Sequence, residues 1–225
     1  MVIKHCSFDH RGGWYHYRVH QPKATLLNEN GYRPLSLYLQ RLFENCPSYP
    51  FFSGPRGSSL KFKLSGLNLI NIKGHEVSGL AGFGLETNRE RFKTNHSKVQ
   101  MFMLENDTKT IAVEIPIWLY SDEIEDYHQT FKSKETLTGH IDVLRLEGGK
   151  IWVWDYKPNA HREKYASTQV YFYALMLAKR TGLSLRNFRC GYFDHNNAYV
   201  FSPDDCIIHK NKGLRAFLEK IYKFK

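Results

Sequence analysis

The chain has 225 residues, of which 42% are hydrophobic and 24% charged, a composition that is typical of soluble globular proteins and excludes disordered and collagen-like classes. No apolar run is long enough to span a membrane and the first residues form no secretory signal, so we expect an intracellular protein, in the cytoplasm or in a eukaryotic organelle or nucleus, without a membrane partner. Lysine plus arginine number 32 against 22 aspartates and glutamates, and the net charge of +10 favours a polyanionic partner.

The excess of basic residues lies at the two ends of the chain. Residues 1–63 carry a net charge of +6 and residues 207–225 carry +5, whereas residues 64–206 carry −1. A lysine or arginine near a phosphate releases a condensed counterion, so basic ends are suited to holding a nucleic-acid backbone. A solvated basic tail is the alternative explanation for the C-terminal stretch.

Few elements are clear in the first half of the chain. The segment 14–20 mixes aromatic and basic residues, which suits either a half-buried strand or stacking on nucleic-acid bases. Residues 34–46 place apolar side chains on one helical face, as a helix that packs on the core would. The pattern is poor between 74 and 104, where 86–93 indicates a helix.

The pattern becomes clear after residue 105. Strands are predicted at 110–120, 137–146, 151–157, 188–194 and 199–201. Pro116 suggests that the first of them lies at a sheet edge. A helix is predicted over 166–180, with Gly182 at a C-cap position. This order of elements predicts an α/β core with one mixed sheet.

Two aspartates and a lysine lie on neighbouring predicted strands. Asp142 is on the second strand, and Asp155 and Lys157 share a face at the end of the third because strand side chains alternate. The tight turn at 148–149 makes these strands antiparallel neighbours, which can bring Asp142 beside Asp155. Two carboxylates suit a hard divalent cation, Mg²⁺ or Mn²⁺, and together with an ammonium group they serve phosphodiester hydrolysis.

A surface salt-bridge cluster is the alternative for these residues. This alternative is weakened by the apolar residues next to them in the sequence, since Asp155 follows the apolar run 152–154 and Asp142 follows Ile141. Burying a carboxylate and a lysine there is costly unless they have a partner or a function.

Three segments together resemble a known family. The segments 139–142 (GHID), 155–157 (DYK) and 169–173 (QVYFY) resemble motifs II and III and the Q-x-x-x-Y helix of the PD-(D/E)xK nucleases, in the RecB-like branch. A D-x-K pair alone is weak evidence, but the three segments in this order are specific in combination. The resemblance covers residues 110–200.

The resemblance implies a restriction-endonuclease-like fold, with a central mixed sheet flanked by helices. Residues 106–225 would form the nuclease core with a basic C-terminal helix, and residues 1–105 a basic and aromatic N-terminal extension whose helices pack on the core in one compact unit. Asp142 and Asp155 would be metal ligands, and Lys157 the catalytic lysine.

Gln169, Tyr173 and Glu114 are further candidates that the resemblance suggests. Gln169 and Tyr173 lie one helical turn apart, where they would contact the lysine or the nucleic acid; a polar helix edge beside an aromatic core residue is the alternative. Glu114 is the one acid in the strand 110–120, and it is a candidate catalytic residue and metal ligand or else an exposed acid of an edge strand.

Four weaker candidates complete the predicted site. His75 is the best match to the first motif of the family, a helical glutamate or histidine, although a lone histidine is more often structural. His140 shares a face with Asp142 and is a candidate DNA contact, as are the basic residues Arg18 and Lys220. The four cysteines form no C-x-x-C pair, so we expect reduced thiols and no iron–sulfur cluster.

These features together predict a Mg²⁺- or Mn²⁺-dependent deoxyribonuclease that hydrolyses DNA phosphodiester bonds. Analogy with the branch favours an exonuclease that acts on ends or single strands in DNA repair. The alternatives are a non-catalytic nucleic-acid-binding module, a nuclease subunit active only in a larger complex, and a ribonuclease or other phosphoesterase. The sequence has no P-loop motif, so any unwinding would come from a helicase or another replication or repair partner.

Overall fold

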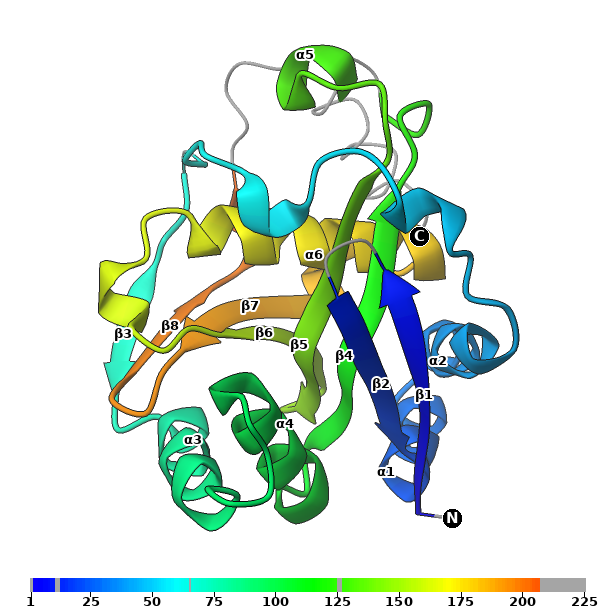
Figure 1. The fold of residues 1–225 in the computed structure, drawn as a ribbon. Helices are drawn as coiled ribbons and strands as arrows, with labels where there is room; N and C mark the ends of the chain where they lie inside the picture. Colours follow the sequence, from blue (N-terminus) through cyan, green and yellow to red (C-terminus); the bar gives the residue numbers. More distant parts are fainter. Residues whose placement is uncertain (1, 11–12, 65, 125–126, 207–225) are drawn as a thin grey trace.

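A single mixed sheet organises the chain (Figure 1). The structure, a computed structural model, describes residues 2–10, 13–64, 66–124 and 127–206. The sheet has eight strands in the order β1-β2-β4-β5-β6-β7-β8-β3, and neighbours are antiparallel except for the parallel pair β6 and β7. The strands are β1 (Ile3–His10), β2 (Gly13–His20), β3 (Ile70–Lys73), β4 (Thr110–Leu119), β5 (Leu137–Glu147), β6 (Lys150–Tyr156), β7 (Phe188–Phe193) and β8 (Asn197–Phe201).

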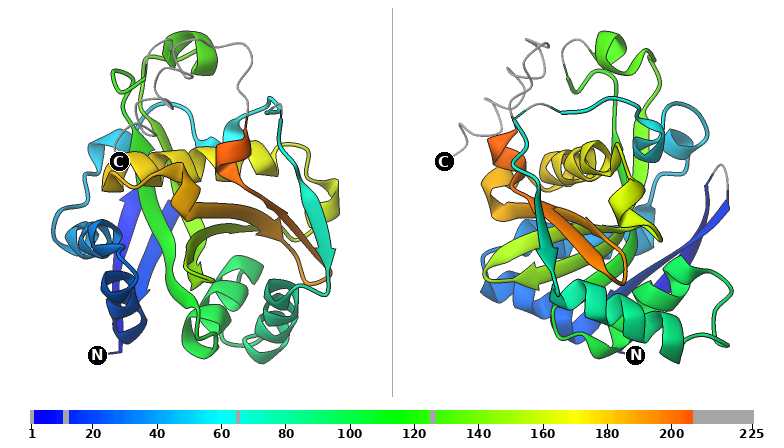
Figure 2. Two further views of the ribbon diagram at one scale, coloured as in Figure 1. Left: turned by 180° about the vertical axis from the view of Figure 1, so that it is seen from behind. Right: turned by 90° about the vertical axis from the view of Figure 1, so that its left-hand side faces the viewer.

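Helices cover both faces of the sheet (Figures 1 and 2). They are α1 (Gln21–Glu29), α2 (Arg33–Asn45), α3 (Glu76–Thr87), α4 (Asn95–Asn106), α5 (Tyr127–Phe131) and α6 (Ala166–Thr181). The long helix α6 crosses one face, and α3 and α4 pack on the other. The sheet therefore lies between two apolar layers, and its central strands are buried on both sides.

Helix α6 connects the two parallel strands. Parallel neighbours need a crossover connection, and α6 provides it between β6 and β7. Residues 168–178 are all buried, which explains why the helix is apolar almost all the way round. Gly182, at φ 71°, ends it in the left-handed conformation that glycine adopts without strain.

The regular alternation of β4 and β5 breaks at a point that the two strands share. Side chains two residues apart on a strand normally share a face. Ile115 and Ile141 nonetheless pack in the apolar cluster of α6, whereas Val113 and Val143 pack in the cluster of α3 and α4. The break falls between the members of each pair, where Glu114 and Asp142 face each other in the strand register.

The predicted α/β class, a mixed sheet flanked by helices, is confirmed. Five predicted strands and the helix over 166–180 are present within two residues of the expected bounds. The helix predicted over 86–93 is wrong, because α3 ends at Thr87 and α4 begins at Asn95.

Pro116 does not mark an edge strand, because β4 lies between β2 and β5. The pairing of β2 with β4 is confined to Ala112 and Val113, so Pro116 lies beyond it on a stretch that is an edge locally. Proline has no N–H to donate to a neighbouring strand, which explains why it is tolerated there. Its carbonyl accepts a hydrogen bond from the Tyr38 hydroxyl at 2.6 Å.

Two simpler expectations can also be compared with the fold. No helix in the described ranges is long and apolar enough to cross a bilayer. All four cysteines lie in the described ranges, and none of them forms a disulfide.

Candidate active site

The candidate site begins where β5 and β6 separate. The ladder between them pairs 143–147 with 150–154 and ends before Asp142 and Asp155, the next opposed pair. The Oδ2 atom of Asp142 accepts a hydrogen bond from the backbone N–H of Tyr156 at 2.9 Å. At the fork, the Asp142 carboxylate thus satisfies a backbone N–H that no longer pairs with β5. This hydrogen bond holds Asp142 against β6.

Asp155 is held through both of its carboxylate oxygens. Its Oδ2 lies 2.6 Å from Nζ of Lys157, and its Oδ1 accepts a hydrogen bond from Nε2 of Gln169 at 2.8 Å. The residue is 1% exposed. The backbone N–H of Lys157 donates to the carbonyl of Phe193 at 2.8 Å, which extends the β6–β7 pairing and fixes where the lysine leaves the strand.

Gln169 and Tyr173 lie beside these carboxylates on α6. Nε2 of Gln169 also donates to the Tyr173 hydroxyl at 3.0 Å. The Tyr173 ring packs so closely on Gly139 that a Cβ atom at that position would overlap it. The glycine of the segment 139–142 is therefore needed for α6 to approach β5, and the two sequence segments meet at one place.

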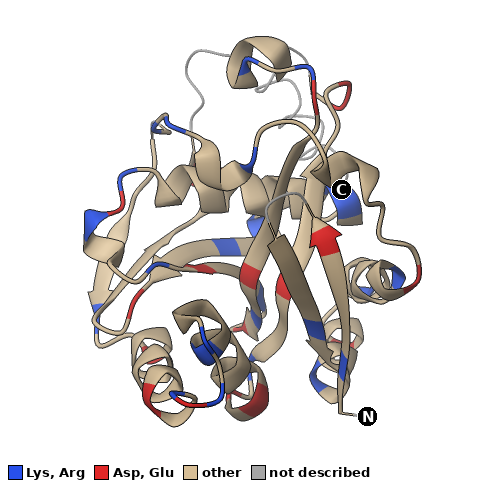
Figure 3. Cartoon of the chain, viewed as in Figure 1, with Lys and Arg blue, Asp and Glu red and all other residues tan. Residues whose placement is uncertain are grey.

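Glu114 lies at a second fork, between β2 and β4. Its carboxylate accepts a hydrogen bond from the backbone N–H of His16 at 2.5 Å, beyond the last residue of β2 that pairs with β4. Its φ of 52° is strained for a residue with a side chain, and such strain is concentrated at functional sites. Burial raises the pKa of Glu114 despite the opposing effects of the His16 N–H and of Arg18. Figure 3 shows acidic residues on the neighbouring strands β4 and β5 in the middle of the sheet.

We call Glu114, Asp142, Asp155 and Lys157 the carboxylate site. Burial raises the pKa of Asp155 to about 6; Lys157 opposes this shift and Asp142 adds to it. Burial also raises the pKa of Asp142, against the effects of His96 and Lys157. Burial would lower the pKa of Lys157, but Asp155 and Asp142 outweigh it and raise that pKa, so the side chain is an ammonium ion. Asp142 and Asp155 thus share one ammonium group, and Glu114 adds a third carboxyl group beside Asp142.

The donors of the carboxylate site fit a hard divalent cation. Within the described part of the chain, no three His, Cys, Asp or Glu side chains meet closely enough to form a complete metal-binding group. Asp142 and Asp155 therefore offer two protein ligands and no closed cage. Mg²⁺ is usually bound in this way, by one or two carboxylates, with the remaining positions taken by water and substrate phosphate oxygens. A cation would also offset the burial cost that raises the pKa of Asp155.

His96 is the residue that the sequence prediction missed. It lies in the first turn of α4, where its Nε2 is 3.6 Å from Oδ2 of Asp142 and its ring meets Tyr156 edge-on. Nothing local marks it, because the segment before residue 104 has a weak pattern and the contact joins residues 46 positions apart in the chain. Thr94, a residue type that commonly caps helices, was the available signal that a helix starts beside His96.

His75, predicted as the first-motif residue, lies elsewhere. It caps the N-terminus of α3, where its Nδ1 accepts from the backbone N–H of Val77 at 3.2 Å. Its ring packs near Trp152 and Trp154. His75 therefore supports the start of α3, and its role as the first-motif residue stays a prediction.

The predicted DNA contacts are placed differently. His140 is buried and forms a 2.9 Å hydrogen bond with His10, so it supports the sheet beside Asp142 and is not open to solvent. Arg18 is half-buried and donates from Nη1 to the carbonyl of His16, next to Glu114. Lys220 lies outside the described residues.

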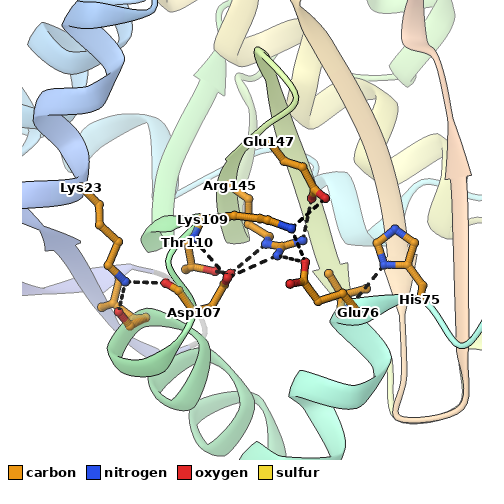
Figure 4. Close-up of polar contacts among 10 residues, drawn as sticks. Lys23, His75, Glu76, Asp107, Lys109, Thr110, Arg145 and Glu147 are labelled. Atoms are coloured by element: carbon orange, nitrogen blue, oxygen red, sulfur yellow. Dashed lines mark hydrogen bonds and ion pairs between the residues drawn. The ribbon is translucent and has the colours of Figure 1, made fainter.

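A second charged cluster lies at the turn end of the β5–β6 hairpin (Figure 4). Arg145 has no exposed side-chain surface and contacts Asp107 at 2.8 Å, Glu76 at 2.7 Å and Glu147 at 2.9 Å. Lys109 contacts Glu76 at 2.6 Å and Glu147 at 3.1 Å. We call these five residues the Arg145 network. Its acids are paired directly with its cations, so it fits a structural role.

A basic cleft of about 650 Å³ opens one strand away from Asp155. Tyr192, which pairs with Asp155 in the β6–β7 register, lines it together with Lys63, Arg162 and Lys164. Three cations around a cleft of this size suit a phosphate-bearing ligand.

Comparison with known proteins gives one match. The family model for the PD-(D/E)XK nuclease superfamily matches residues 81–218, more than half of the chain. No curated protein and no solved structure matches the chain significantly. The matched range contains α4, the strands β4 to β8 and α6, and therefore every residue of the carboxylate site.

Proposed function

Because the chain belongs to the PD-(D/E)XK nuclease superfamily, we propose that it is a Mg²⁺- or Mn²⁺-dependent deoxyribonuclease that hydrolyses DNA phosphodiester bonds. One observation carries the proposal. Asp142, Asp155 and Lys157 meet at the fork between β5 and β6, with the lysine 2.6 Å from a buried carboxylate.

Asp142 and Asp155 would hold the cation, since their oxygens belong to opposed residues of adjacent strands. When bound, the metal polarises the scissile phosphate and lowers the pKa of a water molecule. The hydrogen bond from Gln169 fixes Oδ1 of Asp155 and so orients Oδ2 toward the site. The N–H of Tyr156 does the same for Asp142.

Lys157 stays protonated beside these carboxylates and supplies the positive charge of the reaction. Its ammonium group can orient the attacking water and stabilise the negative charge that develops on the phosphate oxygens. The backbone bond to Phe193 holds the lysine at the end of β6, so little rearrangement is needed when substrate arrives.

Glu114 and His96 complete the proposed site. Glu114 faces Asp142 across the β4–β5 register and would serve as a further metal ligand or second-sphere acceptor. His96 stands at the start of a helix, 3.6 Å from Asp142, and we assign it the place of the first-motif residue.

The substrate assignment rests on charge. The net charge of +10 and the cations Lys63, Arg162 and Lys164, in the cleft one strand away from Asp155, favour a polyanion. The RecB-like resemblance favours DNA, with exonuclease action on ends or single strands in repair.

The test is degradation of end-labelled single-stranded and duplex DNA, and of matched RNA, with Mg²⁺, Mn²⁺ or EDTA. We expect metal-dependent cleavage of DNA. In Lys157→Ala the barrier should rise by about 2–4 kcal/mol or more, judged from single electrostatic donors in other enzymes. Lys150→Ala, at the other end of β6, is the matched control and should cut normally because its Nζ contacts only the carbonyl of Arg186 among the bonds described.

The outcomes separate the alternatives. Equal cleavage by Lys157→Ala removes the lysine from the reaction. DNA binding without cleavage in either metal supports a non-catalytic module or a subunit that needs a larger complex. Preferential cleavage of RNA would change the substrate assignment from DNA to RNA and leave the assignment of the active site unchanged.

A further inference from the structure

Trp14 is exposed at the outer end of the hairpin formed by β1 and β2. Its exposed fraction is 66%, whereas Trp118 and Trp154 are buried. The hairpin projects from the sheet on the side that carries α3 and α4 (Figure 2). It precedes residue 81, where the family match begins.

One face of the hairpin is fastened to the strand that carries Asp142. The Tyr15 ring stacks on His140 with centroids 3.6 Å apart, and His10 stacks on Phe51 at 3.8 Å. His10 and His140 are joined by their 2.9 Å hydrogen bond, and the Tyr15 hydroxyl accepts from Arg56. His140 is two residues before Asp142, so the hairpin end has a defined position relative to the carboxylate site.

The other face of β2 carries Trp14, His16 and Arg18, because side chains alternate along a strand. The backbone of His16 binds Glu114, and Arg18 acts electrostatically on the same carboxylate. Two residues of a strand span about 7 Å, so Trp14 lies roughly that far beyond the Glu114 contact. An exposed indole and a cation therefore share one face of β2, with the Glu114 contact between them.

We propose that Trp14 is a stacking platform for an unpaired base of the nucleic-acid strand whose phosphate enters the carboxylate site, an inference that rests on the proposed function for the identity of that strand. An indole face stacks on any base with little sequence preference. Bases inside a duplex are already stacked and cannot meet it. The hairpin thus gives the protein a preference for single strands, with His16 and Arg18 close to the backbone.

The experiment measures binding apart from cleavage, by fluorescence anisotropy of labelled oligonucleotides in EDTA. Trp14→Ala should bind an oligothymidine strand about tenfold more weakly than the wild type, the loss expected for one base–aromatic stack. Its affinity for a blunt duplex should not change. Trp14→Phe should retain most of the single-strand affinity. Phe83→Ala removes another exposed aromatic residue, on α3, and should have no effect.

A strand in which abasic sites replace the bases sharpens the test, since wild type and Trp14→Ala should bind it equally. Equal oligothymidine affinity of the two proteins, at unchanged melting temperature, overturns the inference. An equal loss on single strand and duplex also overturns it, because it indicates a contact without base stacking. Failure of the nuclease proposal would appear separately, as absence of cleavage in Mn²⁺ while the Trp14 effect on binding persists.

Discussion

Strand β5 carries two charged clusters that differ in how their charges are balanced. In the Arg145 network, at the turn end, two cations contact three carboxylates at 2.6–3.1 Å. In the carboxylate site, at the fork, Asp142 and Asp155 share one lysine, which pairs directly with Asp155, and Glu114 adds a third carboxyl group. Both clusters combine Asp and Glu carboxyl groups with basic side chains, and both include residues of β5.

The pKa shifts separate the two clusters. Burial acts upward on the pKa of Asp107, but the hydrogen bond and charge of Arg145 outweigh it and lower that pKa. Burial prevails at Asp142 and Asp155, whose pKa values are raised. A network that supplies its own counter-charges stabilises the fold, whereas a cluster left short of positive charge has room for a cation from outside.

The largest effect should follow from breaking the Arg145 network. Arg145→Ala leaves Asp107 buried without its partner, and removing one member of a buried ion pair costs about 3–5 kcal/mol. We expect this loss in the free energy of unfolding, measured by urea denaturation. Asp142→Asn should lose little or gain stability, because the amide oxygen can still accept from Tyr156 while a buried charge disappears. Equal losses of unfolding free energy in the two variants would contradict the distinction between a stabilising network and a site that lacks positive charge.

The contributions of the two clusters to the free energy of unfolding should also change with pH in opposite directions. Without metal, folded Asp155 keeps its proton up to pH about 6 and the unfolded chain releases it near pH 4, so this residue lowers stability as the pH rises from 4 to 6. Two pKa units correspond to about 3 kcal/mol. Asp107, with its lowered pKa, contributes stability above its unfolded value that is lost on acidification.

Urea midpoints in EDTA measure both contributions, between about pH 4 and 6 for Asp155 and below about pH 4 for Asp107. Relative to Asp155→Asn, the wild type should become less stable with rising pH; relative to Asp107→Asn, it should become more stable. If both stability differences changed with pH in the same direction, the carboxylate site would be neutralised by its own cations, as the Arg145 network is.

Added Mn²⁺ should stabilise the protein through the carboxylate site. At a metal concentration about 100 times the dissociation constant, ligand binding adds about 2.7 kcal/mol to the free energy of unfolding. The melting temperature should therefore rise for the wild type and for Glu147→Gln, in the network, but not for Asp142→Asn or Asp155→Asn. A rise in all four proteins would place the metal elsewhere.

The distance along the chain between contacting residues explains how much of the fold and of the site could be predicted from the sequence. Asp142, Asp155 and Lys157 flank a short hairpin, so local alternation and a tight turn suffice to bring them together. Gln169 follows on the next helix, within the same short span. The strand pairing of β2 with β4 and the approach of α4 to Asp142 depend on contacts between distant segments, which no local pattern encodes.

His96 and His75 give the smallest and most direct test of that limit. His96→Ala removes a partly exposed ring, 42% accessible, from the neighbourhood of Asp142 and should lower kcat/KM for DNA cleavage about tenfold, or about 1.4 kcal/mol, with little effect on stability. His75→Ala should leave cleavage unchanged and cost about 1 kcal/mol of stability, since it removes a helix cap. Cleavage rates and urea midpoints of both variants decide between the residues. If His75→Ala loses activity and His96→Ala does not, the choice made from the sequence was right, because the reaction would then depend on a side chain that the fold places at the start of α3.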